Sequence, residues 1–288
     1  MSTVVMLALM WNCGRPPADM DKPHPSIGFW GYIFDPSYEI DAPPQGQPRY
    51  YCPQAGDVFL GTDSRFFWGF GYKLVGSGHP HHSGTVFQRS NGEWAVLEAG
   101  PHDTRWIRTF EAYYHFTSYQ DQPGGRVWVR QRKVPLTPEE SARLTEFAEM
   151  EDGKHFAGPR MFWQLTHIRT KNPLLLNWFG KPKGPNRIRY YCCQLGLEGG
   201  VYAGYMDPET TRPIATWPRE LFFDHSKNGY VDRHPPLKDY WFPPARWLKC
   251  LPEPAGCEPD AKYPAPPTFQ PPPAPTQPPP PGIQIPAK

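Results

Sequence analysis

The chain has 288 residues, a formal net charge of +2, 40 Pro and 26 Gly. Aromatic residues make up 15% of it, which excludes a wholly disordered chain because disordered chains are poor in them. The charges are interspersed, so no nucleic-acid partner is expected, and no apolar stretch approaches the ~20 residues that span a bilayer.

Proline and aromatic residues divide the chain into three predicted segments. Residues 1–54 are rich in both and are predicted to form an irregular arm that wraps the core. Residues 55–251 are predicted to form the folded domain. Residues 252–288 contain 15 Pro among 37 residues, and proline lacks the amide donor that sheets and helices need. This tail is predicted to be disordered or extended and solvated; docking to an aromatic groove of a partner is the alternative.

Strand signals dominate the first part of the predicted domain. A short strand is expected over 57–60, and the aromatic segment 65–74 is expected to lie against the core, with an apolar ligand groove as the alternative. Strands over 83–88 and 94–99 flank Asn91-Gly92, a hairpin signal. Residues 126–132 alternate as a strand should.

A helix is predicted next, and it begins with a capping box. Thr137 is the expected N-cap, Pro138 occupies the first helical position, and Glu140 lies three residues after the cap. Gly153 ends the helix. A second helix is predicted from about residue 190. This order of elements, strand, hairpin, strand, helix and helix, indicates an α+β domain with a small antiparallel sheet packed on helices.

Residues 158–189 read as a long excursion between the two helices. The segment is rich in Gly, Pro and basic residues, and a loop of this length is usually functional or an insertion. We consider two interpretations, a lid over a site that receives an anionic substrate and a solvated surface, and we favour the surface.

The cysteines and the N-terminus bear on localisation. Residues 3–11 are apolar but follow no Lys or Arg, which is atypical of a secretory signal. Six cysteines are few for a secreted scaffold of this length, and a disulfide between neighbouring cysteines is strained. Mostly reduced thiols and a cytoplasmic location are therefore expected; an exported or cell-envelope protein is the alternative. The oligomeric state is left open.

Three short stretches carry the residue types of a thiol nucleophile with its base and orienting group. His82 begins a predicted strand, Glu98 lies at the end of the next, and Cys192 lies at the start of the second helix. A helix N-terminus and an adjacent imidazolium both favour the thiolate. The alternatives are a buried structural cysteine, a histidine of a His-rich loop and a surface carboxylate.

These stretches, in this order, resemble the permuted papain-like hydrolases of the NlpC/P60 superfamily, with the YiiX/YaeF-like amidases as the most similar group. The resemblance covers roughly residues 55–224 and rests on the segments 56–58 (GDV), 82–86 (HSGTV), 96–99 (VLEA), 191–195 (YCCQL), 203–204 (AG) and 216–222 (TWPRELF). It implies a permuted papain-like fold in which the histidine strand precedes the cysteine helix.

By this resemblance Cys192 matches the nucleophile, His82 the base and Glu98 the third polar residue. The group commonly has Ser and Glu after its cysteine, where this chain has Cys193 and Gln194. The resemblance implies hydrolysis of a peptide or acyl-amide bond; a thioesterase or acyltransferase, or a non-catalytic binding module, are the alternatives. The glycines after Cys192 favour a short or irregular helix.

No metal or other cofactor is predicted. His79 and His81 share a face of an extended chain and His82 does not, so the three histidines do not converge on one ion.

The turn of the hairpin decides whether Glu98 can orient His82. With a two-residue loop, Asn91-Gly92, the two side chains project from opposite faces. With a three-residue loop, in which Gly92 is left-handed, Arg89 pairs with Glu93 and His82 lies on the same face as Glu98. The Asn91-Gly92 dipeptide favours the two-residue loop, whereas the catalytic interpretation requires the three-residue loop.

Overall fold

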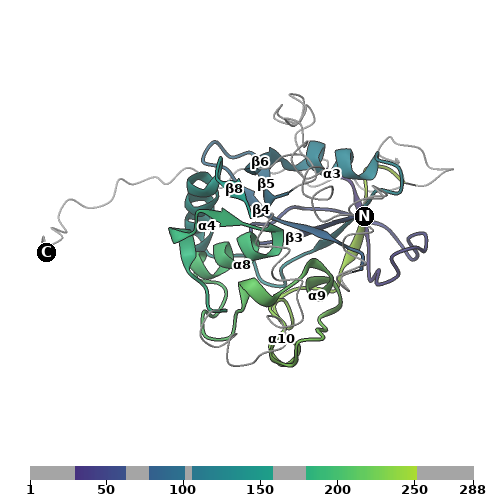
Figure 1. Cartoon of the computed structure of the whole chain (residues 1–288). Coiled ribbons are helices and arrows are strands. Elements are labelled where there is room, and N and C mark those ends of the chain that lie inside the picture. Colours follow the sequence, from purple (N-terminus) through teal and green to yellow (C-terminus); the bar gives the residue numbers. More distant parts are fainter. Residues whose placement is uncertain (1–29, 63–77, 101–105, 158–179, 252–288) are drawn as a thin grey trace, which may run out of the picture.

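One antiparallel sheet of eight strands organises the part of the chain that the computed structural model describes, residues 30–62, 78–100, 106–157 and 180–251 (Figure 1). Its strands are β1 (Tyr32–Phe34), β2 (Arg49–Tyr50), β3 (Val58–Thr62), β4 (His82–Gln88), β5 (Trp94–Ala99), β6 (Ile107–Glu111), β7 (Arg126–Arg130) and β10 (Ala245–Leu248). They lie in the order β2-β1-β10-β7-β3-β4-β5-β6, and every neighbouring pair is antiparallel.

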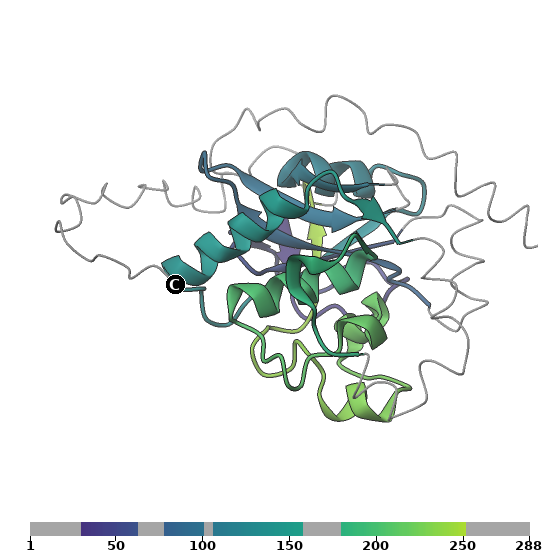
Figure 2. The ribbon, with the colours of Figure 1, turned by 60° about the vertical axis from the view of Figure 1, so that its left-hand side comes forward.

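Helices cover both faces of this sheet. Helix α3 (Ala112–Gln120) packs on one face through Phe116 and Tyr119, which contact Phe59 and the other apolar side chains of that face. The opposite face is covered by α4 (Pro138–Glu151), α8 (Cys192–Ala203) and α9 (Pro218–Phe223), with the short α10 (Gly229–Arg233) beyond them (Figure 2). The predicted α+β class, an antiparallel sheet packed on helices, is confirmed.

The predicted capping box is present at the start of α4. The Thr137 hydroxyl accepts from the Glu140 amide at 3.2 Å, and the Glu140 carboxylate accepts from the Thr137 amide at 2.9 Å. Leu144, Phe147 and Ala148 are buried on one face of the helix, against α8 and the sheet. Gly153 follows the helix with φ +83°, a conformation that glycine adopts without a steric penalty.

The N-terminal arm and the end of the domain supply part of the sheet. Apart from β1 and β2, the described part of the arm, residues 30–54, has no helix or strand. Its Phe34 and Tyr51 side chains are buried, as expected. In addition, β1 pairs with β10, which itself pairs with β7. Local sequence does not reveal these pairings, because the partners, such as Tyr32 and Leu248, lie near opposite ends of the described chain.

The Gly56-Asp57 pair joins the arm to the sheet. Asp57 is fully buried, and its carboxylate accepts from the Arg132 amide at 2.9 Å, the Gln54 amide at 3.1 Å and the Tyr51 hydroxyl at 3.0 Å. Burial outweighs these donors and raises the pKa of Asp57 to about 7. The motif therefore holds the start of β3 against the end of β7.

The base of the excursion is closed by a second, two-stranded parallel sheet, β8 (His155–Phe156) and β9 (Arg189–Tyr190). Glu198 of α8 anchors the end of the excursion: its carboxylate accepts from the Arg187 guanidinium and from the amides of Lys183 and Gly184, each at 2.7 Å. Residues 158–179 lie outside the described residues, as do the segment 65–74 and the tail from 252. The lid, the apolar groove and the solvated tail stay predictions.

Three of the four cysteines in the described residues, Cys52, Cys192 and Cys193, are free. The fourth, Cys250, is disulfide-bonded. Among the described cysteines, free thiols are therefore the majority, as expected. Among the described helices, none combines the length and the apolar character needed to cross a membrane.

Candidate active site

The β4–β5 hairpin brings His82 and Glu98 together. The Arg89 amide donates to the Glu93 carbonyl at 2.8 Å, and the loop between them is Ser90-Asn91-Gly92, with Gly92 at φ +89°. Gly84 therefore lies opposite Glu98, and His82 lies one diagonal step away on the same face. His82 Nε2 lies 2.7 Å from Glu98 Oε2. The three-residue loop is confirmed, and the dipeptide rule by itself is wrong here.

Cys192 lies at the first position of α8, after the N-cap Tyr191. Its sulfur lies close enough to the His82 imidazole and the Ser83 amide for both groups to lower the pKa of the thiol. Because Glu98 engages Nε2 of His82, Nδ1 is the ring nitrogen left to interact with the sulfur. The side chains of Cys192, His82 and Glu98 thus lie one beside the next, and we call this arrangement the row. All three are buried.

The electrostatics of the row favour a thiolate and an imidazolium. A hydrogen bond from Cys193 lowers the pKa of the Cys192 thiol; burial opposes this shift, but the hydrogen bond and charge of His82 reinforce it, and the pKa ends well below its ordinary value. Burial also lowers the pKa of His82, but Glu98 and Cys192 outweigh it, and the pKa is raised well above its ordinary value. For Glu98, burial raises the pKa, but the interactions with His115 and His82 outweigh it and hold the pKa well below the ordinary range.

Cys193 points away from the imidazole. Its sulfur lies 3.2 Å from the Ser83 hydroxyl, and its side chain belongs to the apolar cluster between α8, α9 and the sheet. Burial raises the pKa of the Cys193 thiol, and the hydrogen bond to Cys192 raises it further. Cys193 therefore stays a thiol and serves as a donor to its neighbour.

The glycines of α8 do not shorten the helix, contrary to the expectation from their low helix propensity. The helix runs regularly over Cys192–Ala203, and its glycines lie where it is packed closely. A Cβ on Gly196 would lie 2.6 Å from the Thr85 hydroxyl, and one on Gly199 would lie 3.0 Å from the Phe147 ring. Close packing on β4 and α4 compensates for the propensity, so the start of α8 is held firmly beside His82.

His115 of α3 is a fourth member of the row and was missed from the sequence. Its Nε2 lies 2.8 Å from the same Glu98 oxygen that binds His82. The pairing of β5 with β6, and the start of α3 directly after β6, place α3 over Glu98. A local signal existed in the buried positions Ala112, His115, Phe116 and Tyr119, whose spacing is that of one helix face.

The Tyr119 ring and the backbone at Gly100 hold the His82 imidazole in place. Tyr119 stacks on it at a centroid distance of 5.7 Å and an interplanar angle of 15°. On another side lies Gly100, where a Cβ would come within 2.9 Å of the ring carbon Cε1. The imidazole is therefore confined to the orientation in which its two nitrogens serve Glu98 and Cys192.

His79 and His81 lie together, as predicted, on a side that His82 does not share. Their Nδ1 atoms are 3.1 Å apart, and Thr62 contacts both rings. Within the described residues, no group of three or more His, Cys, Asp or Glu side chains is arranged to hold a metal ion.

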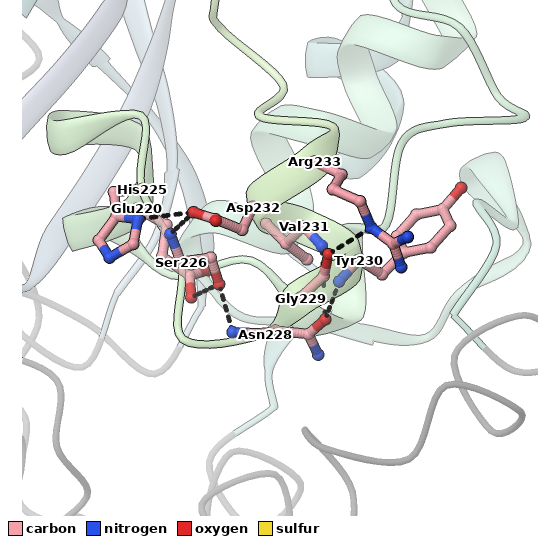
Figure 3. A network of polar contacts seen from close by, with 9 residues as sticks. All are labelled: Glu220, His225, Ser226, Asn228, Gly229, Tyr230, Val231, Asp232 and Arg233. Atoms are coloured by element: carbon pink, nitrogen blue, oxygen red, sulfur yellow. Dashed lines mark hydrogen bonds and ion pairs between the residues drawn. The ribbon is translucent and has the colours of Figure 1, made fainter.

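A polar network links α9, the loop that follows it and α10 (Figure 3). Glu220 accepts from the Trp217 amide at 2.8 Å and bonds with the Ser226 hydroxyl. Asp232 accepts from the Ser226 amide at 2.8 Å and pairs with His225 at 2.6 Å. Burial raises the pKa of Glu220 to about 7, and the Glu220 charge contributes to the raised pKa of Cys193.

A small cavity lies on the core side of the two sulfurs. It is lined by Ser83, Cys192 and Cys193 together with apolar side chains such as Leu197 and Leu221. Its volume of about 10 Å³ is close to the room that one water needs, so it does not hold a substrate.

No protein-family model matches the sequence, and no curated protein matches it. Among solved structures, the chain is similar to the crystal structure of metalloprotein YiiX from Escherichia coli O157:H7. The two share 18% sequence identity, the match covers 62% of this chain and 85% of that one, and the TM-score is 0.37.

Proposed function

We propose that the protein is a cysteine-dependent hydrolase that cleaves an amide bond, in a peptide or an acyl-amide, through an acyl-enzyme at Cys192. The observation that carries the proposal is the row of contacts from Cys192 through His82 to Glu98, with a 2.7 Å bond between the last two. The resemblance of the motifs to the permuted papain-like hydrolases of the NlpC/P60 superfamily supports the same roles.

The chemistry follows from the protonation states. The Cys192 thiolate attacks the carbonyl carbon and a C–S bond forms, while the carbonyl electron pair moves to the oxygen. The His82 imidazolium gives its Nδ1 proton to the leaving nitrogen, and the C–N bond breaks. Water then attacks the thioester with neutral His82 as base, the carboxylic product leaves, and the thiolate–imidazolium pair is restored.

The start of α8 supplies positive potential for the oxyanion. Tyr191 makes no side-chain cap, and the first bond within the helix runs from the Leu195 amide to the Tyr191 carbonyl at 3.0 Å. The amides of Cys192 and Cys193 come before Leu195 and so have no carbonyl acceptor within the helix. These N–H groups and the positive end of the helix dipole point toward the place where the negative charge of the oxyanion develops.

Alkylation by iodoacetamide at mildly acidic pH, with mapping of the modified peptide, tests the activated thiol. An ordinary thiol with a pKa near 8.5 is well under about 1% ionised there. We expect Cys192 to react much faster than the free, exposed Cys52, and the reaction to vanish in Cys192→Ala but persist in Cys52→Ser and Cys193→Ser. Equal rates at Cys192 and Cys52 would contradict the proposal and favour a non-catalytic binding module. Loss with Cys193→Ser alone would move the role to the neighbouring sulfur.

Turnover separates the hydrolase from the related activities. The enzyme is incubated with p-nitrophenyl acetate, and the acyl group is located by mass spectrometry. We expect a transient thioester on Cys192 that water removes, and parallel cleavage of a peptide anilide library by the unmodified protein but not by Cys192→Ala. Cleavage of thioesters without any amide cleavage would instead assign a thioesterase, and transfer to an added amine in preference to water would assign an acyltransferase.

A further inference from the structure

The carboxylate of Glu98 carries two imidazoles on one oxygen. Its Oε2 lies 2.7 Å from Nε2 of His82 and 2.8 Å from Nε2 of His115. Its Oε1 is buried and has no hydrogen-bond partner among the described residues. An ionised carboxylate can only accept, so both histidines must donate through Nε2. The two imidazoles are therefore the direct hydrogen-bond compensation that this buried charge receives in the described part of the chain.

The surroundings of His115 favour its role as a hydrogen-bond donor to Glu98 through Nε2. It is fully buried, with Phe110 stacked on its ring at 4.9 Å and 1°, and with Phe59 and Tyr119 at 5.2 and 5.1 Å. Its Nδ1 is buried without a hydrogen-bond partner among the described residues, so a proton there would be an unpaired buried N–H. The surroundings thus favour the neutral tautomer that carries its hydrogen on Nε2, facing Glu98.

We propose that His115 is a positioning residue, which keeps Glu98 ionised and aligned so that His82 presents Nδ1 to Cys192. The inference rests on the proposed function, which it extends to a row of four: Cys192, His82, Glu98 and His115. Without the second donor, the buried carboxylate keeps a single hydrogen bond, and its neutral form becomes more favourable. The His82 imidazolium then loses its counter-charge, and the thiolate loses its partner.

Among the described residues, the titratable groups that face this row come from β4, α3, α8 and β6. His82 comes from β4, His115 and Tyr119 come from α3, and Cys192 comes from α8. Arg108 occupies the position of β6 opposite Glu98 and is 3.6 Å from Asp152. A change in the pH profile of Cys192 on substitution of His115 therefore reports on the Glu98 charge.

The pH dependence of Cys192 alkylation by iodoacetamide in the full chain tests the role. In His115→Phe, which suits the aromatic surroundings but cannot donate, we expect the midpoint to rise by about one pH unit or more, a tenfold loss of reactivity at acidic pH. In His115→Gln, whose amide can donate from a similar place, we expect most of the wild-type profile. His225→Gln, at an exposed histidine of the α9–α10 network, is the matched control and should titrate as wild type.

A measurement on the unaltered protein makes the test independent of folding of the variants. The nitrogen spectrum of ¹⁵N-histidine-labelled protein should show His115 as the Nε2–H tautomer, and Glu98→Gln should perturb that signal. A wild-type midpoint in His115→Phe, or an Nδ1–H tautomer, would overturn the inference while leaving the proposed function intact. An ordinary thiol titration of Cys192 in the wild type would instead remove the proposed function itself.

Discussion

Arg89 and Glu93 face each other at the end of the β4–β5 hairpin, and the bond from the Arg89 amide to the Glu93 carbonyl fixes the register of every pair behind it. One residue fewer in the loop would turn Glu98 to the face opposite His82. The Gly92 amide closes the turn onto the Arg89 carbonyl at 2.9 Å, with Gly92 in the left-handed region. The contact between His82 and Glu98 thus depends on the left-handed conformation of Gly92, which lies between them in the sequence.

Gly92→Ala should destabilise the protein and leave the site in place, because alanine can adopt the same left-handed conformation, but at a cost in free energy. A Cβ on Gly92 would meet nothing within 4 Å, so the expected loss of about 1–2 kcal/mol comes from the left-handed backbone alone. Gly229→Ala is the matched control, because that glycine also has open space around it but lacks a positive φ. Urea unfolding measures both. Equal effects of the two substitutions would show that the backbone of Gly92 is not responsible.

Cys193 should influence the acidity of Cys192 through its thiol hydrogen. Cys193→Ala removes the donor, so we expect the alkylation midpoint of Cys192 to rise, whereas Cys193→Ser keeps a donor and should stay close to wild type. The pH profile of iodoacetamide labelling at Cys192 measures the difference. Identical profiles for the Ala and Ser variants would show that the Cys193 thiol does not stabilise the thiolate.

Glu220 should make stability depend on pH. Its folded pKa of about 7 lies above its ordinary 4.5, so the folded state binds the proton more tightly, and stability falls as the pH rises between these values. Glu220→Gln cannot ionise and can keep the bond to the Trp217 amide and the bond to the Ser226 hydroxyl, the latter drawn in Figure 3. Urea unfolding should show it equal to wild type near pH 4.5 and more stable by up to about 3 kcal/mol at pH 8. The exposed Glu149→Gln is the control, and a difference independent of pH would refute the assignment.

Arg130 should tolerate no conservative replacement. Its guanidinium is buried and binds Asp224 through two nitrogens, at 2.6 and 2.8 Å, and also the Leu221 and Phe242 carbonyls. A lysine cannot form this fork, so Arg130→Lys should cost about 3 kcal/mol in the free energy of unfolding. Arg126→Lys, on the same strand but paired with the exposed Asp41, should cost under about 1 kcal/mol. Comparable losses in both variants would contradict this account.

Local chemistry determined a good part of this protein from sequence. The capping box at Thr137, the alternation of β7 and the hairpin around Asn91-Gly92 depend on neighbouring residues only, and the structure has all three. The candidates His82, Glu98 and Cys192 were found because their residue types and order match a motif.

Tertiary structure decided the rest, because it depends on contacts between distant segments. The insertion of β10 between β1 and β7 follows from pairing across the whole domain, which no local pattern encodes. The glycines of α8 weaken a helix in isolation, yet they allow its close approach to Thr85 and Phe147. His115 lies only 17 residues from Glu98 in the sequence, yet it reaches Glu98 only because β6 pairs with β5 and α3 folds back across that face of the sheet. Sequence named the candidate groups, and strand order and register determined which of them meet, since a side chain contacts only what the fold places within a few ångströms of it.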